Sequence, residues 1–146
     1  MLMNDVVTAG AHVEIAAIER LIADHAELLD HARWHEVAEL YTEDGRLEGV
    51  GPRPLVGHDA FHAWAAKRAE NSARRTHHQC TNIRVDLTAE DKAVGTVMLV
   101  LHVFDENQPE KGVVTEAVGE YLDDYLKIDG RWRFTRRRLV PIGPRN

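Results

Sequence analysis

The sequence has few of the residues on which several common kinds of functional site depend. Cys80 is its only cysteine, which excludes an intrachain disulfide and any metal site built from several thiolates. Ser72 is its only serine, and it lies in a polar stretch without the Gly-x-Ser-x-Gly pattern of a serine nucleophile. The 18 Lys and Arg residues are outnumbered by 24 Asp and Glu, and the formal charge of −6 argues against a nucleic-acid partner.

Long hydrophobic runs are also absent. The longest apolar run, Val97 to Leu101, is far shorter than the roughly 20 residues that a membrane helix needs. The first ten residues contain no Lys or Arg and no sustained apolar stretch, so they do not resemble a secretory signal. We therefore expect a soluble cytoplasmic protein with no membrane partner.

Length and composition indicate a single domain over residues 1–146, because 44% of the residues are hydrophobic and 29% are charged. We expect residues 1–11 to form a flexible N-terminus. Apolar spacings of three and four predict helices over 13–31, about 34–41 and 59–68, with a short strand over 46–50 between the last two. From Arg75 onward the period is 2, which predicts strands over 76–87, 93–104, 113–128 and 131–140. This order is typical of an α+β fold, with helices packed on one face of a mostly antiparallel sheet.

The composition is unusual in one respect, because nine of the residues are histidine. The two pairs with helical i,i+4 spacing are His31 with His35 and His58 with His62. In neither pair is the first histidine followed by the glutamate of a zincin motif. His77 and His78 are adjacent in a predicted strand, so their side chains point to opposite faces. We therefore predict no metal site and no cofactor.

A run of basic residues, 131–138, resembles a nucleic-acid patch until the strand period is applied. Strict alternation sends Arg133 and Arg137 to one face of the strand. It sends Trp132, Phe134, Arg136 and Arg138 to the other face. The acidic segment 120–124 is the expected hairpin partner, so cross-strand ion pairing explains the charges better than nucleic-acid binding does.

His78 and Asp30 form a candidate acid–base pair. His78 lies at the start of a predicted strand, and Asp30 lies at the end of the first predicted helix. The strand residues in phase with His78 are Thr76, Cys80 and Asn82. A helix end and a strand start can meet at the open end of the core, where a carboxylate bonded to one imidazole nitrogen leaves the other as a base. Alternatively, Asp30 caps the second helix.

Three segments carry a resemblance to a known family. They are the strand beginning Thr76-His77-His78-Gln79-Cys80-Thr81-Asn82, the stretch from Leu29-Asp30 to the turn Tyr41-Thr42-Glu43-Asp44-Gly45, and the ending Asp129-Gly130-Arg131-Trp132. Together they resemble the SnoaL-like group of the nuclear-transport-factor-two-like superfamily, over about residues 12–140. The resemblance implies a cone-shaped α+β barrel, in which three N-terminal helices pack in a strongly curved, mostly antiparallel sheet around a deep pocket.

The resemblance also implies roles for individual residues. In the dehydratases and dehydrochlorinases of this group, a His–Asp pair at the pocket floor removes a proton from carbon, and its positions match His78 and Asp30. The positions of Arg137, His25, Leu99 and Leu101 match substrate-binding or pocket-wall residues. His102 has the opposite phase on its strand and is expected at a surface or interface. Leu29 and Gly49 stand where the dehydratases have tyrosines.

These observations predict a cofactor-independent lyase or isomerase, dehydratase-like or dehydrohalogenase-like, acting on a small apolar or cyclic substrate. The alternative is a non-catalytic protein, either a small-ligand binder or the small subunit of a ring-hydroxylating dioxygenase. The predicted strands carry apolar residues in both phases, so one sheet face is left to be covered by a partner. A homodimer or a homotrimer fits the resemblance.

Overall fold

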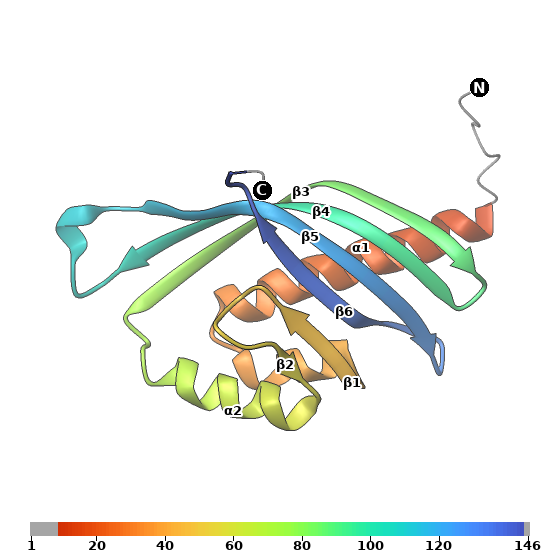
Figure 1. Cartoon of the computed structure of the whole chain (residues 1–146), viewed down its shortest axis with the longest axis horizontal. Coiled ribbons are helices and arrows are strands. Elements are labelled where there is room, and N and C mark those ends of the chain that lie inside the picture. The colour runs from red at the N-terminus through yellow and green to blue at the C-terminus, as the bar shows by residue number, and fades with distance from the viewer. Residues whose placement is uncertain (1–8, 145–146) are drawn as a thin grey trace.

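The structure, a computed structural model, describes residues 9–144 and contains one curved sheet with helices on its inner side (Figure 1). The elements in chain order are α1 (Ala9–Asp30), η1 (Trp34–Leu40), β1 (Tyr41–Glu48), β2 (Leu55–Val56), α2 (His58–Ala69), β3 (Arg74–Ala89), β4 (Lys92–Asp105), η2 (Pro109–Lys111), β5 (Val114–Ile128) and β6 (Arg131–Pro141). Three helices packed against a mostly antiparallel sheet confirm the predicted α+β class.

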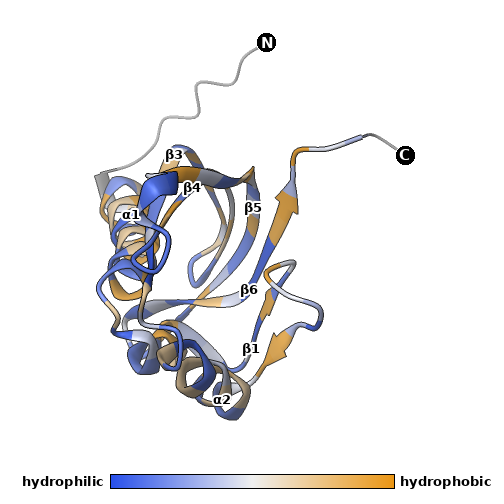
Figure 2. Cartoon of the chain, turned by 90° about the vertical axis from the view of Figure 1, so that its left-hand side faces the viewer, coloured by the Kyte–Doolittle hydropathy of each residue, from blue (hydrophilic) through white to orange (hydrophobic). Residues whose placement is uncertain are grey.

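The six strands are ordered β2-β1-β6-β5-β4-β3. The four long strands form an antiparallel meander, whereas β1 lies parallel to β6. In Figure 2 the meander arches from α1 over to β1, and α2 lies below the arch. The long first helix crosses the concave face and packs mainly against β3. The sheet therefore encloses its helices on the concave side.

Two expectations about local structure are corrected. The first helix begins at Ala9, earlier than the expected residue 13. Residues 1–8 lie outside the described residues. The short strand expected over 46–50 begins earlier, because β1 spans Tyr41–Glu48 directly after the second helix. Tyr41 is fully buried and packs on Phe61 and Phe134, which fixes it in the sheet.

The core lies between α1 and the concave face of the sheet. Ile18 and Ile22 of α1, Val97 of β4 and Phe134 of β6 are each at most 1% exposed. Burial of each such side chain contributes about 1.5–3 kcal/mol to the free energy of unfolding. Among the described residues, no helix is long and apolar enough to span a membrane.

Candidate active site

His78 and Asp30 meet inside the curved sheet. His78 Nδ1 lies 2.6 Å from Asp30 Oδ1, and the backbone N–H of His78 donates to Asp30 Oδ2 at 2.8 Å. The Thr76 hydroxyl donates a third hydrogen bond to Asp30 Oδ1, at 3.0 Å. The carboxylate is thus held by three donors from one strand, which fixes its position relative to the imidazole.

Asp30 reaches β3 because the chain turns sharply at the end of α1. Ala32 has a φ of 60°, a left-handed conformation that ends the helix, and Trp34 Nε1 donates to the carbonyl of Leu29. Asp30 does not cap the second helix, whose N-cap, Arg33, has no side-chain capping bond. The alternative role for Asp30 is therefore wrong.

The chemistry of the pair follows from its hydrogen bonds. Burial favours a neutral Asp30, but the hydrogen bonds from the side chain and backbone of His78 outweigh it, so the pKa of Asp30 is lowered. A charged carboxylate at Nδ1 selects the tautomer with the proton on Nδ1, which leaves a lone pair on Nε2. The His78 and Asp30 side chains are 12% and 11% exposed, so both are largely but not completely buried.

A β-bulge decides which residues of β3 share the face of His78. Thr76, His78 and Cys80 point inward as expected, but the register shifts between Thr81 and Arg84. Asn82 has a φ of 51° and is exposed, which corrects its expected inward phase. Beyond the bulge, Ile83, Val85 and Leu87 occupy the inner face. The bulge keeps the second half of the strand apolar on its inner side.

Arg137 lies inside the sheet, but strict alternation along β6 did not predict its neighbours correctly. Phe134 pairs with Tyr125 and Arg136 with Asp124, so Thr135 is an extra residue in β6. This bulge places Arg137 on the same face as Trp132 and Phe134, while Arg138 is exposed. The predicted phase of Arg137 relative to Trp132 and Phe134 is therefore wrong, because a one-residue insertion reverses every later side chain.

Arg137 is held by a buried network. Its Nε and Nη2 donate to the two carboxylate oxygens of Asp123 at 2.8 and 2.9 Å, and both side chains are 0% exposed. The guanidinium lies 3.9 Å from the ring centre of Tyr121 and 4.4 Å from that of Phe134. Burial disfavours the charge, but Asp123 outweighs this effect and raises the pKa of Arg137. Arg137 Nη1 is buried without a hydrogen-bond partner among the described residues.

His25 is a buried, neutral imidazole on α1. It is 2% exposed, and its Nε2 lies 3.0 Å from the hydroxyl of Tyr41. Burial lowers its pKa well below the ordinary value, and the charge on Arg137 lowers it further. Its ring packs against those of Tyr121 and Phe134. His25 therefore belongs to the same interior cluster as Arg137.

The two predicted pocket-wall residues lie beside the dyad strand. Leu101 pairs with His78 and Leu99 pairs with Cys80 across β3 and β4, so all four side chains share the inner face. Leu99 is only 1% exposed and belongs to the core, whereas Leu101 is partly exposed.

On the opposite face of the sheet, the rings of His77 and His102 stack against each other, with ring centres 6.2 Å apart. His102 therefore lies on the face opposite to that of Leu101, as its phase predicted, and its role at a surface or interface stays a prediction.

Sequence reasoning missed three interior residues: Tyr41, Tyr121 and Asp123. Asp123 was included only in an acidic segment expected to pair with the basic strand. Its period-2 spacing with Tyr121 and Tyr125 was the available signal, because an acidic residue between two inward aromatic residues faces the core. Among the described residues, no three His, Cys, Asp or Glu side chains lie close enough to hold a metal ion.

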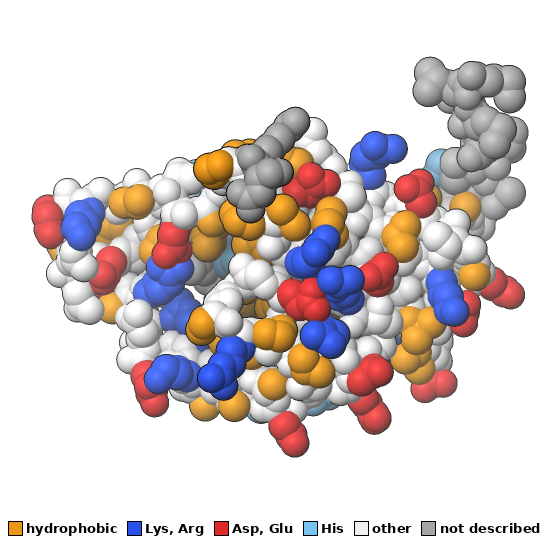
Figure 3. All heavy atoms as spheres, in the orientation of Figure 1, with side chains coloured by type: hydrophobic (Ala, Val, Ile, Leu, Met, Phe, Trp, Pro, Cys, Tyr) orange, Lys and Arg blue, Asp and Glu red, His pale blue; other side chains and the backbone are white. Residues whose placement is uncertain are grey.

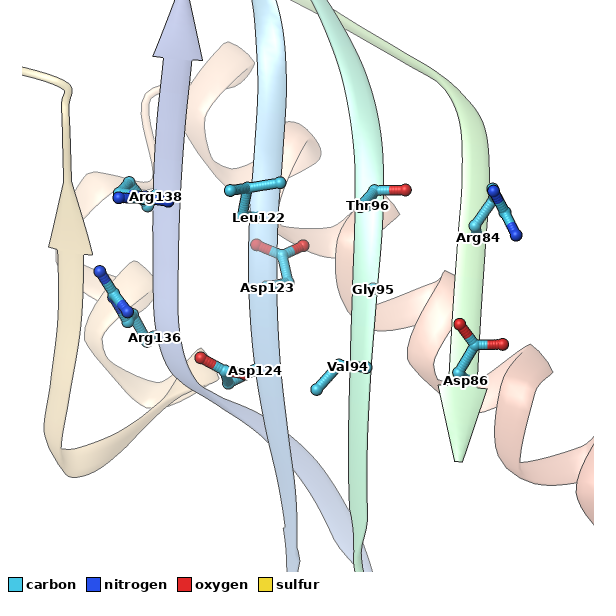
Figure 4. A pocket seen from close by; sticks show the side chains of 10 residues that line it. All are labelled: Arg84, Asp86, Val94, Gly95, Thr96, Leu122, Asp123, Asp124, Arg136 and Arg138. Atoms are coloured by element: carbon cyan, nitrogen blue, oxygen red, sulfur yellow. The ribbon is translucent and has the colours of Figure 1, made fainter. Parts of the chain in front are cut away.

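Two hollows in the surface lie away from the dyad. One, of about 910 Å³, is lined by Tyr41, Arg46, His58 and the end of the β5–β6 hairpin. Another, of about 380 Å³, lies on the convex face of the sheet, with Arg84, Asp86, Asp124 and Arg138 at its edges (Figure 4). The deep pocket expected next to His78 stays a prediction.

The curved sheet around an interior His–Asp pair defines the class of protein: it is a nuclear-transport-factor-two-like α+β fold. The SnoaL-like domain profile matches residues 13–138. The chain therefore belongs to the SnoaL-like domain family.

Two solved structures are similar over most of the chain. The Mycobacterium tuberculosis protein Rv3472, of unknown function, has a TM-score of 0.78 at 28% identity, covering 89% of this chain and 77% of that chain. A candidate scytalone dehydratase from Novosphingobium aromaticivorans has a TM-score of 0.75 at 27% identity, covering 90% of this chain and 85% of that chain.

A curated relative, gamma-hexachlorocyclohexane dehydrochlorinase from Sphingobium indicum, is 28% identical over 130 residues, which cover 84% of this chain and 76% of the relative. A dehydrochlorinase is a lyase, so the chain is related to a family of the lyase or isomerase type.

Proposed function

We propose that this protein is a cofactor-independent lyase or isomerase that removes a proton from a carbon atom of a small apolar or cyclic substrate. The observation that carries the proposal is the 2.6 Å contact between His78 Nδ1 and Asp30 Oδ1. A carboxylate placed on one imidazole nitrogen is the arrangement that makes the other nitrogen an effective general base.

The proposed roles follow from position. His78 Nε2 takes the proton, and Asp30 stabilises the imidazolium that forms. Arg137 Nη1, a buried donor without a partner, receives the negative charge that develops on the departing group. Leu99 and Leu101 provide apolar wall next to the base, and His25 lies beside Arg137 as a neutral substrate neighbour.

The dehydrohalogenase-like form of the reaction has more support than the dehydratase form. A curated relative is named as a dehydrochlorinase. The dehydratases have a tyrosine at the position of Gly49. A side chain does not fit there in this chain, because a Cβ would lie 2.2 Å from the carbonyl oxygen of Leu139. Leu29, at the other tyrosine position, packs against the core. Leaving-group assistance therefore falls to Arg137.

The alternative is a non-catalytic ligand-binding protein or a dioxygenase small subunit. Neither role requires an imidazole held by a carboxylate with its second nitrogen unpaired. Among the described residues no hydrogen bond is made to His78 Nε2, which suits a base that must accept a proton. This favours the enzyme over the binder.

The test is elimination activity in matched variants. Purified wild type is screened with halogenated cycloalkanes for halide release and with cyclic β-hydroxy ketones for loss of water. We expect His78→Gln and Asp30→Asn to lower kcat by about 10²–10⁴-fold, the usual contribution of a general base. His77→Gln is the matched control, because the adjacent histidine faces the opposite side of the sheet.

Circular dichroism of each variant establishes that the fold is retained. Full activity in a folded His78→Gln variant contradicts the proposed mechanism. Binding of the substrates without turnover supports the ligand-binding alternative instead.

A further inference from the structure

The buried Arg137 is paired in a way that cancels its charge but leaves one donor free. The Asp123 carboxylate accepts hydrogen bonds from Nε and Nη2 of Arg137. The Tyr125 hydroxyl donates to the same carboxylate at 2.7 Å. Only Nη1 remains without a partner among the described residues. The interior therefore offers the unused N–H groups of a guanidinium whose charge Asp123 already balances, and not a free positive charge.

The charges around the dyad can be counted. Arg137 contributes one positive charge, and Asp123 and Asp30 contribute one negative charge each. Burial lowers the pKa of His25 and raises the pKa of Tyr121 to about 12, so both are neutral near pH 7. With His78 in its basic, neutral form, the interior carries a net charge of one negative before any reaction.

We propose that Asp123 is a specificity-determining residue that restricts the site to uncharged substrates and excludes carboxylates and phosphates. This inference rests on the proposed function and adds to it the charge class of the substrate. An anionic substrate entering this interior would lose its hydration and meet a net negative environment. The free N–H groups belong to a guanidinium whose charge Asp123 already balances, so they compensate for less of that loss than an unpaired guanidinium would.

The reaction itself suits a neutral substrate. The C–H proton moves to His78 Nε2, its electron pair forms the new carbon–carbon double bond, and the carbon–leaving-group bond breaks with its pair on the departing anion. Negative charge appears at Arg137 Nη1 only as positive charge appears on His78. The interior therefore keeps the same net charge throughout, and no anion needs to be attracted from solvent.

The experiment measures equilibrium binding and needs no turnover. Trifluoroacetate and its neutral counterpart trifluoroacetamide are titrated against wild type and Asp123→Asn by fluorine NMR at pH 7. Asparagine keeps an oxygen that can accept from Arg137 and Tyr125 but removes the charge. We expect the variant to bind trifluoroacetate at least about tenfold more tightly than wild type, equivalent to about 1.4 kcal/mol, with little change for trifluoroacetamide.

Asp124→Asn is the matched control, since it removes the same charge from the adjacent residue on the convex face (Figure 4). An equal gain in that control, or no gain in Asp123→Asn, overturns the proposal. Should Asp123→Asn not fold, wild type alone still tests it: trifluoroacetate binding more tightly than trifluoroacetamide is the contradicting result. Because no activity is measured, an inactive wild type would count against the proposed function and not against this inference.

Discussion

A histidine on the apolar face of a helix usually signals either a ligand or a satisfied core residue, and His25 shows how the two roles combine. It is buried among the rings of Tyr121 and Phe134 and bonded to Tyr41, so it is part of the core. Burial lowers its pKa, and the nearby charge of Arg137 lowers it further. Its neutral state is therefore coupled to folding.

Replacing His25 should change how stability depends on pH. In the unfolded chain His25 binds a proton near its ordinary pKa of 6.5, whereas burial keeps it neutral in the folded protein. The contribution of His25 to the free energy of unfolding is therefore complete above pH 6.5. It falls as the pH decreases below that value, by up to about 1.4 kcal/mol per pH unit.

We expect His25→Gln to be less stable than wild type at pH 7.5, with a gap that narrows between pH 6.5 and 5. Urea denaturation at a series of pH values measures the gap. A gap that is constant over this range contradicts the assignment of a neutral, buried His25.

At the scale of elements, two bulges determine the inner face of the sheet. One at Asn82 in β3 turns Ile83, Val85 and Leu87 inward, and one at Thr135 in β6 turns Arg137 inward. Without these insertions, Arg84 and Asp86 would follow His78 into the core. The composition of the active-site wall thus depends on two single-residue irregularities.

The Asn82 bulge predicts a measurable cost for one substitution. Asn82 adopts a φ of 51°, which asparagine tolerates and a β-branched residue does not. We expect Asn82→Val to lower the free energy of unfolding by about 1–2 kcal/mol in urea titrations. Thr81→Val, a substitution at the exposed neighbour with ordinary backbone, serves as the comparison. Equal destabilisation in both variants would show that the bulge conformation is not what Asn82 provides.

At the scale of the whole molecule, the convex face of the sheet has no covering element within residues 9–144. It exposes Val94, Val118 and Val140 by 39%, 37% and 42%. Around them stand charges of both signs, and Figure 3 shows such charges interspersed with apolar side chains over this side of the molecule. Among the described residues, no ion pair includes Arg84, Asp86, Asp124 or Arg138.

We propose that this face binds a second copy of the same chain, because a surface with both charge signs and apolar residues complements itself better than it complements a partner of one sign. Light scattering should give a mass that is a multiple of 16.5 kDa for the wild type. Leu122→Glu, on β5 between Arg138 and Thr96 in Figure 4, should shift the mass toward the monomer. The control Val13→Glu, on an exposed position of α1, should not. A monomeric wild type contradicts the proposal.

The amino-acid sequence by itself determined the order of the main helices and of the four long strands. Helical spacing, the change to period 2 and the Asp129-Gly130 turn are local signals, since each depends on residues close together in the chain. The positions of His78 and Asp30 allowed either a pair or a helix cap by Asp30, and the family resemblance favoured the pair. The small, acidic, cysteine-poor composition was sufficient to exclude an intrachain disulfide and multi-thiolate metal sites.

The tertiary structure alone decided which charges are buried together. Strict alternation placed Arg137 on the face of β6 that does not carry Phe134. Only the bulge at Thr135 brings the arginine onto the interior face with Asp123. Bulges depend on packing between strands that are distant in the sequence, so the pattern of a single strand does not reveal them. The unpaired Arg137 Nη1, and with it the expected preference for uncharged substrates, exists only because two strands and one helix enclose that ion pair.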